Sequence, residues 1–173
     1  MALVIPPGVD AEGSVLVKFV PTLADPSAPT TTELNAVGAV DMSCSLTQDG
    51  FKPGADTATG TDTRLCSKQV YETKGATTWS IDNLTYIWDP QNPDSDSNKV
   101  YAALPEDTAG FLVVRWGKDV EDFPALAAAD IVDVFPVVMG PQVPQPPEAN
   151  SKLKVQQKPF VTGSAVRDVT LAA

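Results

Sequence analysis

Proline and glycine limit what this chain can fold into more than any other feature of its sequence. Sixteen prolines and eleven glycines interrupt 173 residues, and both residue types disfavour the interior of a helix. The runs between them are short and rich in β-branched residues, as in Ser14–Val20 and Gly110–Trp116. Short strands separated by turn residues are typical of a β-sandwich or barrel. We therefore predict a mainly β fold with one short flanking helix at about Ser97–Leu104.

Length and charge restrict the domain count and the partners. A chain of 173 residues is long enough for one domain with its own core, and we predict a single domain over residues 1–173. Twelve basic residues face twenty-two acidic ones, which gives a net charge of −10. Such a chain does not gain affinity for nucleic acid by releasing counterions. Ordinary DNA binding is therefore not expected.

The residue types needed for common catalytic chemistry are missing or badly spaced. The sequence has no histidine, which removes Ser-His-Asp and Cys-His catalysis and the commonest zinc ligand. Asp94-x-Asp96-x-Asn98 begins like a calcium loop, but Lys99 and Pro105 stand where glycine and glutamate are needed. We predict no enzymatic activity, no cofactor and no metal site. For Arg115 we expect a structural salt bridge.

The chain carries no stretch typical of a membrane span or a secretion signal. We therefore expect no membrane partner and synthesis in a cytoplasm. Cys44 and Cys66 both lie in strand-like runs, for which a free, buried thiol is the ordinary expectation. A disulfide between them remains open.

The first half of the chain contains one clearly alternating run and one long polar segment. In the predicted strand Val37–Thr47, apolar side chains alternate with small polar ones, including Asp41, Ser43 and Ser45. Gln48–Thr63 is nearly all Gly, Asp, Thr and Ala, and it is predicted to be a long loop. A loop of this length inside a compact domain is usually either functional or disordered. Strands are expected at Arg64–Thr73 and Thr77–Trp88, with a turn at Lys74-Gly75.

The second half ends in strands and a proline-rich segment. Ile131–Met139 is predicted to be a strand, at an edge or with a bulge because Pro136 cannot donate a ladder hydrogen bond. The neighbouring Asp130 and Asp133 are expected to face solvent or another subunit. Residues 140–151 hold four prolines and are predicted to form a stiff connector. The last predicted strands are Lys152–Phe160 and Ala165–Leu171, and residues 1–13 form an N-terminal arm.

Taken in order, several of these segments resemble the major tail tube proteins of long-tailed bacteriophages, particularly phages of actinobacteria. The resemblance runs from about Val37 to the C-terminus. It rests on the segments Val37–Thr47, Gln48–Thr63, Trp79-Ser80-Ile81, Asn98–Leu104, Gly110–Gly117, Asp130–Gly140 and the two terminal strands.

This resemblance implies a β-sandwich with one flanking helix, six of which form a ring, while stacked rings form a tube. Inner strands of neighbouring subunits would join in a shared barrel around a lumen, and the long loop 48–63 would reach the adjacent ring. DNA would pass without specific binding. The implied partners are further copies of the chain, a tape-measure protein and a tail-terminator protein, in a virion tail assembled in the host cytoplasm.

The resemblance also suggests which residues take part. Candidates for lining the lumen are Asp41, Ser43 and Ser45. Candidates for contacts between rings are Asp49, Phe51, Lys52, Asp56 and Asp62. Candidates for contacts between subunits are Lys152, Lys154, Lys158 and Asp130.

Two alternatives remain open at this point. One is another virion protein with a similar sandwich, such as a tail terminator or a capsid decoration protein. The other is an immunoglobulin-like or carbohydrate-binding module that would use Trp79, Trp88 or Trp116 as an exposed stacking platform.

Overall fold

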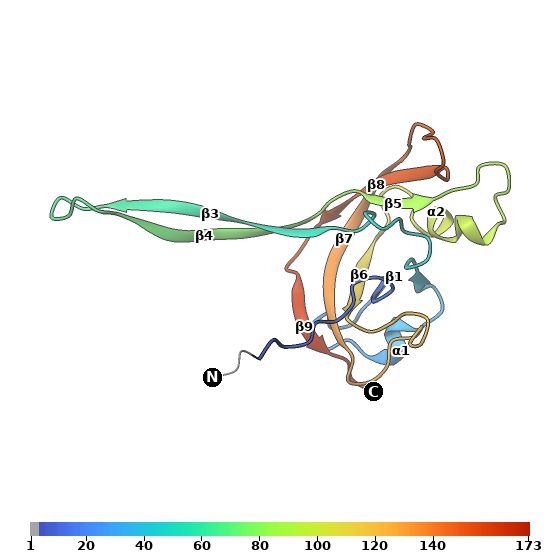
Figure 1. The fold of residues 1–173 in the computed structure, drawn as a ribbon, viewed down its shortest axis with the longest axis horizontal. Coiled ribbons are helices and arrows are strands. Elements are labelled where there is room, and N and C mark those ends of the chain that lie inside the picture. Colours follow the sequence, from blue (N-terminus) through green and yellow to red (C-terminus); the bar gives the residue numbers. More distant parts are fainter. Residues whose placement is uncertain (1–3) are drawn as a thin grey trace.

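A computed structural model describes residues 4–173 of the chain. They form a mainly β protein, as the sequence predicts (Figure 1). The strands are β1 (Val15–Val20), β2 (Val40–Asp41), β3 (Pro53–Thr63), β4 (Val70–Ile81), β5 (Leu84–Ile87), β6 (Ala109–Trp116), β7 (Ile131–Pro144), β8 (Lys154–Val161) and β9 (Val166–Thr170). The helical elements are α1 (Thr31–Leu34), the 3-10 turn η1 (Asp96–Asn98) and α2 (Lys99–Ala103).

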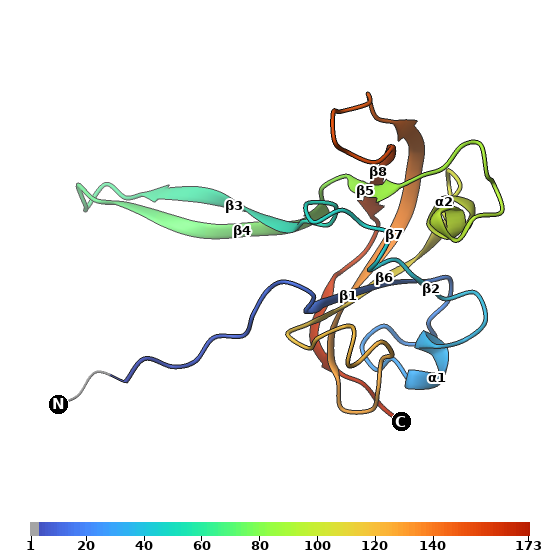
Figure 2. The ribbon, with the colours of Figure 1, turned by 45° about the vertical axis from the view of Figure 1, so that its right-hand side comes forward.

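One antiparallel sheet organises the body of the protein. Its seven strands follow the order β2-β1-β6-β7-β8-β5, and β9 also pairs with β7. The sheet curls into a half-barrel, which the two views in Figures 1 and 2 show. The body is therefore a curled sheet, where the sequence left a choice between a sandwich and a barrel.

Residues 40–50 connect the two edges of this curled sheet. β2 pairs with β1 at one edge. A few residues later the Thr47 amide donates to the carbonyl oxygen of Thr85 on β5, at the other edge, with 2.9 Å between the atoms. Gly50 is needed for this close approach, since a Cβ there would lie 2.3 Å from the same carbonyl oxygen. The crossing covers backbone that would otherwise be a free sheet edge.

The predicted strand Val37–Thr47 is wrong except at Val40–Asp41. The side chain of Asp41 accepts hydrogen bonds from the amide of Ser43, at 2.9 Å, and from its hydroxyl, at 2.7 Å. Such local side-chain bonds offer the backbone an alternative to a sheet ladder. The segment therefore turns, and its apparent alternation does not describe two faces of a strand.

The core lies on both faces of the central strands. Val17, Leu112 and Phe135 are buried within the curl of the sheet. Leu16 and Val113, which point the other way, are buried against α1 and the loops outside it. Strands covered on both faces read as continuous apolar runs, which explains the run of Gly110–Trp116.

The sequence predicts an edge or a bulge for this strand because of Pro136. The edge is wrong, whereas register shifts interrupt the pairing of β7 between Val132 and Val134 and between Met139 and Gln142. β7 pairs with β6 on one side and with β8 and β9 on the other, so it is not an edge strand. Pro136 stands between the part of β7 that pairs with β9 and the part that pairs with β8. Pro136 is therefore paired with β6 but has no ladder partner in β8 or β9. A residue without a backbone N–H is tolerated at such a position.

The described part of the chain contains two short helices where one was predicted. The predicted helix corresponds to η1 and α2, with the Ser95 side chain accepting from the amide of Ser97 at the start. The additional helix is α1. It begins with a capping box, in which Thr30 and Glu33 each accept a hydrogen bond from the other's backbone amide. A single turn of four residues has too little periodicity to be recognised from sequence.

A long two-stranded hairpin formed by β3 and β4 projects from the body (Figures 1 and 2). The predicted loop Gln48–Thr63 is wrong over most of its length, because Pro53–Thr63 is strand β3. The predicted turn at Lys74-Gly75 is also wrong, since both residues lie inside β4 and residues 64–69 form the turn. Gly75 lies beside a register shift, where an added Cβ would come within 2.7 Å of the Ala58 carbonyl oxygen.

Two smaller expectations also change. The connector predicted over residues 140–151 is partly strand, because β7 continues to Pro144. Cys44 and Cys66 are free, but both are exposed where burial was predicted. The terminal strands β8 and β9 agree with the predicted ones.

Candidate assembly surfaces

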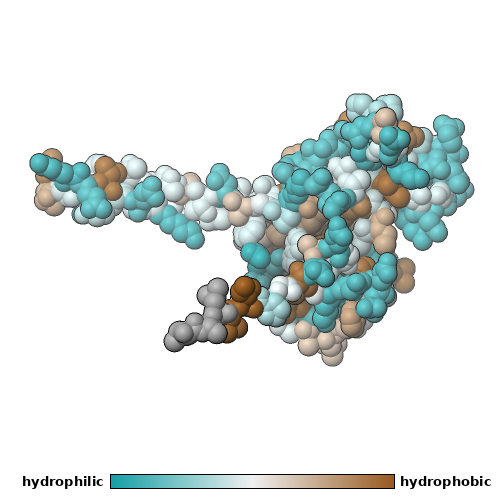
Figure 3. All heavy atoms as spheres, in the orientation of Figure 1, coloured by the Kyte–Doolittle hydropathy of each residue, from teal (hydrophilic) through white to brown (hydrophobic). Residues whose placement is uncertain are grey.

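The hairpin is exposed along almost its whole length. Every residue of β4 from Val70 to Thr78 is exposed, and none of β3 is fully buried. Large hydrophobic side chains near its distal end face solvent, and Figure 3 shows separate brown spots there among paler and teal spheres. These side chains are Leu65, Val70 and Tyr71, which are 112 %, 56 % and 46 % exposed. None of the three is among the residues predicted to contact another ring or subunit, although exposed apolar residues in a polar segment are a signal for such contacts.

The base of the hairpin is fixed to the body. The ring of Trp79 on β4 meets the ring of Phe135 on β7 edge-on, with 6.0 Å between centroids. The guanidinium of Arg167 lies 5.6 Å from the centroid of the same indole. The ammonium of Lys158 donates to the carbonyl oxygen of Ile81 at 2.6 Å. Contacts at the base therefore set the direction in which the hairpin leaves the sheet.

The five residues predicted to contact another ring divide into two groups. Asp49 and Lys52 form an exposed ion pair below the hairpin, at 3.2 Å. Phe51 is half-buried beside them. Asp56 and Asp62 lie on β3 itself, and Asp62 pairs with Arg64 at 2.6 Å. Contact of these residues with another ring stays a prediction.

The three residues predicted to line a lumen lie together on the crossing segment 40–50, although not on a strand. Asp41 is exposed, while Ser43 and Ser45 are half-buried. The Ser43 hydroxyl accepts from the amide of Val17 at 2.9 Å, so it also joins the segment to β1. Their place at a lumen remains untested.

Three of the four residues predicted to contact another subunit have partners in their own chain. Lys154 pairs with Glu148 at 2.8 Å, and the ammonium of Lys158 donates to the carbonyl oxygen of Ile81 at the end of β4. Asp130 is buried, and Lys152 is exposed. Contact between subunits through these side chains stays a prediction, which the burial of Asp130 does not favour.

Asp130 holds the loop after β6 to the body. Its carboxylate pairs with the buried guanidinium of Arg115 at 3.3 Å and with Lys118. Burial acts to raise the pKa of Asp130, but hydrogen bonds from Lys118, the Ala127 amide and Arg115 hold that pKa below its ordinary value. The structural salt bridge predicted for Arg115 is present.

The expectation that Asp130 and Asp133 face solvent is wrong, because both are buried. Asp133 accepts from the indole N–H of Trp116 at 3.0 Å and from the amide of Asp168 at 3.0 Å. Each buried carboxylate accepts hydrogen bonds from its own donors, and these bonds offset the free-energy cost of burying its charge.

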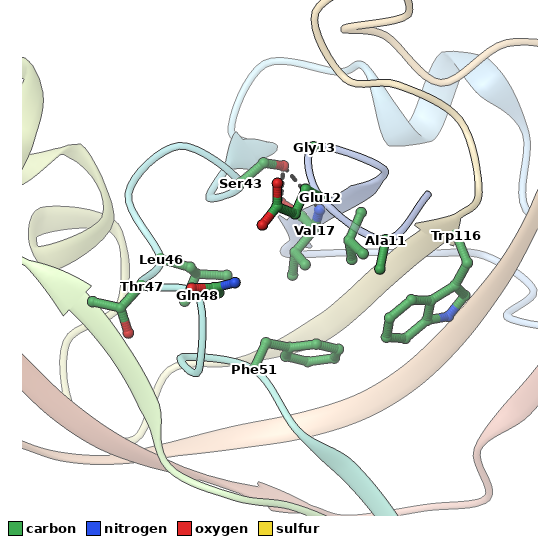
Figure 4. Close-up of a pocket in the computed structure, with 11 residues that line it drawn as sticks. Ala11, Glu12, Gly13, Val17, Ser43, Leu46, Thr47, Gln48, Phe51 and Trp116 are labelled. Carbon is green, nitrogen blue, oxygen red and sulfur yellow. Dashed lines mark hydrogen bonds between the residues drawn. The ribbon is translucent and has the colours of Figure 1, made fainter. Parts of the chain in front are cut away.

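An apolar groove with a cavity volume of about 610 Å³ lies between the start of β1 and the crossing segment (Figure 4). Phe51 and Trp116 form its aromatic side, with 6.3 Å between ring centroids. Trp116 is 45 % exposed there, so an indole that sequence alone would assign to the core faces the groove. Val15, Val17 and Leu46 contribute aliphatic surface, and Glu12 and Gln48 are polar lining residues.

Within residues 4–173, no group of three or more His, Cys, Asp and Glu side chains is arranged to hold a metal ion. In the same part of the chain, no helix combines the length and apolar character required to span a membrane.

The fold and these surfaces define a β-rich module with a projecting hairpin, an exposed arm and an aromatic groove. Residues 3–173 match the model of a family described as phage tail tube protein. The chain therefore belongs to the phage tail tube protein family, and it is a structural protein of the phage tail.

The fold of the chain is similar to that of a solved structure. The chain is similar to one in the cryo-EM structure of the anti-feeding prophage (AFP) baseplate, 6-fold symmetrised, with a TM-score of 0.51 and 10 % identity. The match covers 95 % of this chain and 98 % of that one. No curated protein matches the sequence.

Proposed function

We propose that this protein polymerises as stacked six-membered rings into the phage tail tube, through which DNA passes without specific binding. The role is structural and requires no enzymatic chemistry, cofactor or metal. The observation that carries the proposal is the hairpin, together with membership of the tail tube family. The chain acts as one domain, with residues 4–13, the hairpin and residues 145–151 as its protruding parts; residues 1–3 of the predicted arm lie outside the described residues.

The hairpin needs a partner for physical reasons. A two-stranded hairpin alone is at best marginally stable in water, and this one is exposed on both faces beyond its base. In the proposal, contact with a second copy of the chain buries the exposed faces of the hairpin. A projecting element that binds a different surface on the next copy makes a heterologous contact, which generates open stacks of subunits or rings.

The charge distribution favours the same arrangement. Residues 53–81 contain three acidic residues, Asp56, Asp62 and Glu72, and three basic ones, Arg64, Lys68 and Lys74. The hairpin is therefore neutral, and the whole net charge of −10 lies in the rest of the chain. A neutral hairpin approaches an acidic neighbour without net repulsion, whereas the acidic body repels DNA phosphates. Asp41, Ser43 and Ser45 are our candidates for the surface that faces DNA.

Six-fold symmetry in the AFP baseplate supports rings of six for this chain. In the proposal, strands of neighbouring subunits complete a shared barrel around the lumen. The tape-measure and tail-terminator proteins are the expected partners inside and above the tube. In the proposal, the phage is of the long-tailed type and is similar to phages of actinobacteria, and the tail is assembled in the host cytoplasm; these points rest on the sequence resemblance alone.

Shortening the hairpin tests the proposal. Removing residues 58–76 and joining Thr57 to Thr77 through Asn-Gly keeps the base that contains Trp79, because Thr57 and Thr77 face each other in the ladder. Wild-type protein at rising concentration should sediment as long particles, and the shortened variant should remain as subunits or single rings. Near-ultraviolet circular dichroism checks that the body still folds. Equal polymerisation of a folded, shortened variant would overturn the proposal.

A further inference from the structure

The N-terminal arm has unusual chemistry for an exposed segment. Val4, Ile5 and Val9 are 85 %, 80 % and 72 % exposed, and residues 4–9 carry no charge. The arm leads away from the body in Figure 2, and its apolar side chains form the brown group beside the body in Figure 3. Exposed apolar residues in a continuous run mark a contact site.

Two prolines fix the shape of this arm. Pro6 and Pro7 hold φ near −65°, and the residue before each proline is restricted to extended conformations. Ile5–Pro7 is therefore preorganised as a stiff, extended segment. Such a segment loses little conformational entropy when it binds.

The groove between Phe51 and Trp116 has the matching chemistry. Extended proline-containing segments bind grooves lined by aromatic side chains, and both rings are accessible here. Ala11, Glu12 and Gly13 form part of the groove wall (Figure 4). The arm thus starts at the groove and leaves it, and its own Ile5–Pro7 enters only if the chain reverses within residues 8–10.

We infer that Ile5–Pro7 of one copy lies in the Phe51–Trp116 groove of a second copy. The occupant is uncharged, so the Glu12 carboxylate on the groove wall does not repel it. Each copy offers one arm and one groove at different places, and the contact therefore also propagates from copy to copy. This inference deepens the proposed function and rests on it, because the contact acts within the proposed assembly of stacked rings.

Mixing two single-cysteine variants tests the contact between copies. Both carry Cys44→Ser and Cys66→Ser, because these thiols are exposed. One adds Ile5→Cys, and the other adds Gln48→Cys in the groove lining. With dissolved oxygen and a copper catalyst, the two thiols lose two electrons and two protons to oxygen and form one disulfide. A mixed, reducible dimer is expected, at least tenfold more abundant than with Asp122→Cys, which lies on an exposed loop.

Two other results of this experiment overturn the inference. If Leu65→Cys replaces Ile5→Cys as the efficient partner of Gln48→Cys, the hairpin tip occupies the groove. If a dilute double variant with Ile5→Cys and Gln48→Cys forms only an internal disulfide, the arm binds its own groove.

A peptide titration separates this inference from the proposed function. A labelled peptide of residues 1–10 is titrated with full-length Ile5→Asp protein, whose own arm no longer competes. Saturable binding is expected, and the same change in the peptide should weaken it at least tenfold. Absence of saturation up to about 1 mM protein overturns the inference, even if wild-type tubes form. Binding without tubes at any concentration overturns the proposed function instead.

Discussion

Trp79 on the hairpin packs edge-on against Phe135 in the centre of the sheet, with 6.0 Å between ring centroids and 63° between ring planes. Phe135 is buried in the core within the curl. This pair joins the exposed hairpin to the buried core of the sheet. The direction of the hairpin is thus determined by core packing and does not depend on the turn at its tip.

Replacing Trp79 with alanine should loosen the hairpin. Loss of a fully buried tryptophan costs about 3–5 kcal/mol, and for the half-buried Trp79 we expect about 2 kcal/mol of unfolding free energy. Amide exchange in β3 and β4 should accelerate more than in β6. Trp79→Phe, which retains a ring against Phe135, should recover most of the loss. Unchanged exchange in the alanine variant would contradict this anchoring role.

Removing the Asp130 carboxylate should destabilise the loop that follows β6. Asp130→Asn leaves the guanidinium of Arg115 buried without its ion pair, and breaking a buried pair costs about 3–5 kcal/mol. Chemical denaturation measures the effect. The matched control Asp122→Asn changes an exposed carboxylate and should alter stability by less than about 0.5 kcal/mol. Equal effects of the two changes would contradict the assignment.

Acid should act on the same carboxylate. Because folding lowers the pKa of Asp130, its contribution is complete above the unfolded value of about 3.9 and is lost as pH falls through the folded value. Wild-type stability should therefore decline below about pH 4. The Asp130→Asn variant should show a shallower decline. Parallel pH profiles for the two proteins would contradict this account.

Tyr86 should resist ionisation. Burial raises the pKa of Tyr86 to about 12, against the opposing effect of its hydrogen bond with Gln142. Since the folded pKa is raised, its contribution to stability is complete below the unfolded value of about 10 and is lost as pH rises through 12. Ultraviolet titration should show a phenol that ionises only near that pH or on unfolding.

Tyr86→Phe tests the hydrogen bonds of the same residue. The change leaves the buried side-chain oxygen of Gln157 without its donor and should cost about 1–3 kcal/mol. Tyr71→Phe on the exposed part of the hairpin is the matched control and should be nearly neutral. A Tyr86→Phe variant as stable as that control would contradict the role of this bond.

Local patterns were sufficient where one residue's neighbours in sequence decide its structure. The continuous apolar run of β6 is a signal of this kind, and the strand is present. The structural salt bridge of Arg115 was also predicted from the sequence, and it is present. Its partner Asp130 was placed at the surface, because the loop contacts that bury it involve residues outside its own strand.

The hairpin and the crossing segment were missed for different physical reasons. β3 is rich in threonine, but its glycines and aspartates are typical of loops, and no apolar face reveals it as a strand. In residues 37–47, Asp41 and Ser43 hydrogen-bond locally and override an alternation that resembles a strand. The groove depends on Phe51 and Trp116 meeting across the fold, and no local sequence pattern encodes that contact.

Cryo-electron microscopy of the wild-type protein assembled at high concentration tests the central claim most directly. We expect hollow filaments built of six-membered rings, with β3 and β4 of each subunit crossing into the adjacent ring. Filaments in which the hairpin stays within its own ring, or protein that remains as single subunits at every concentration, would contradict the account.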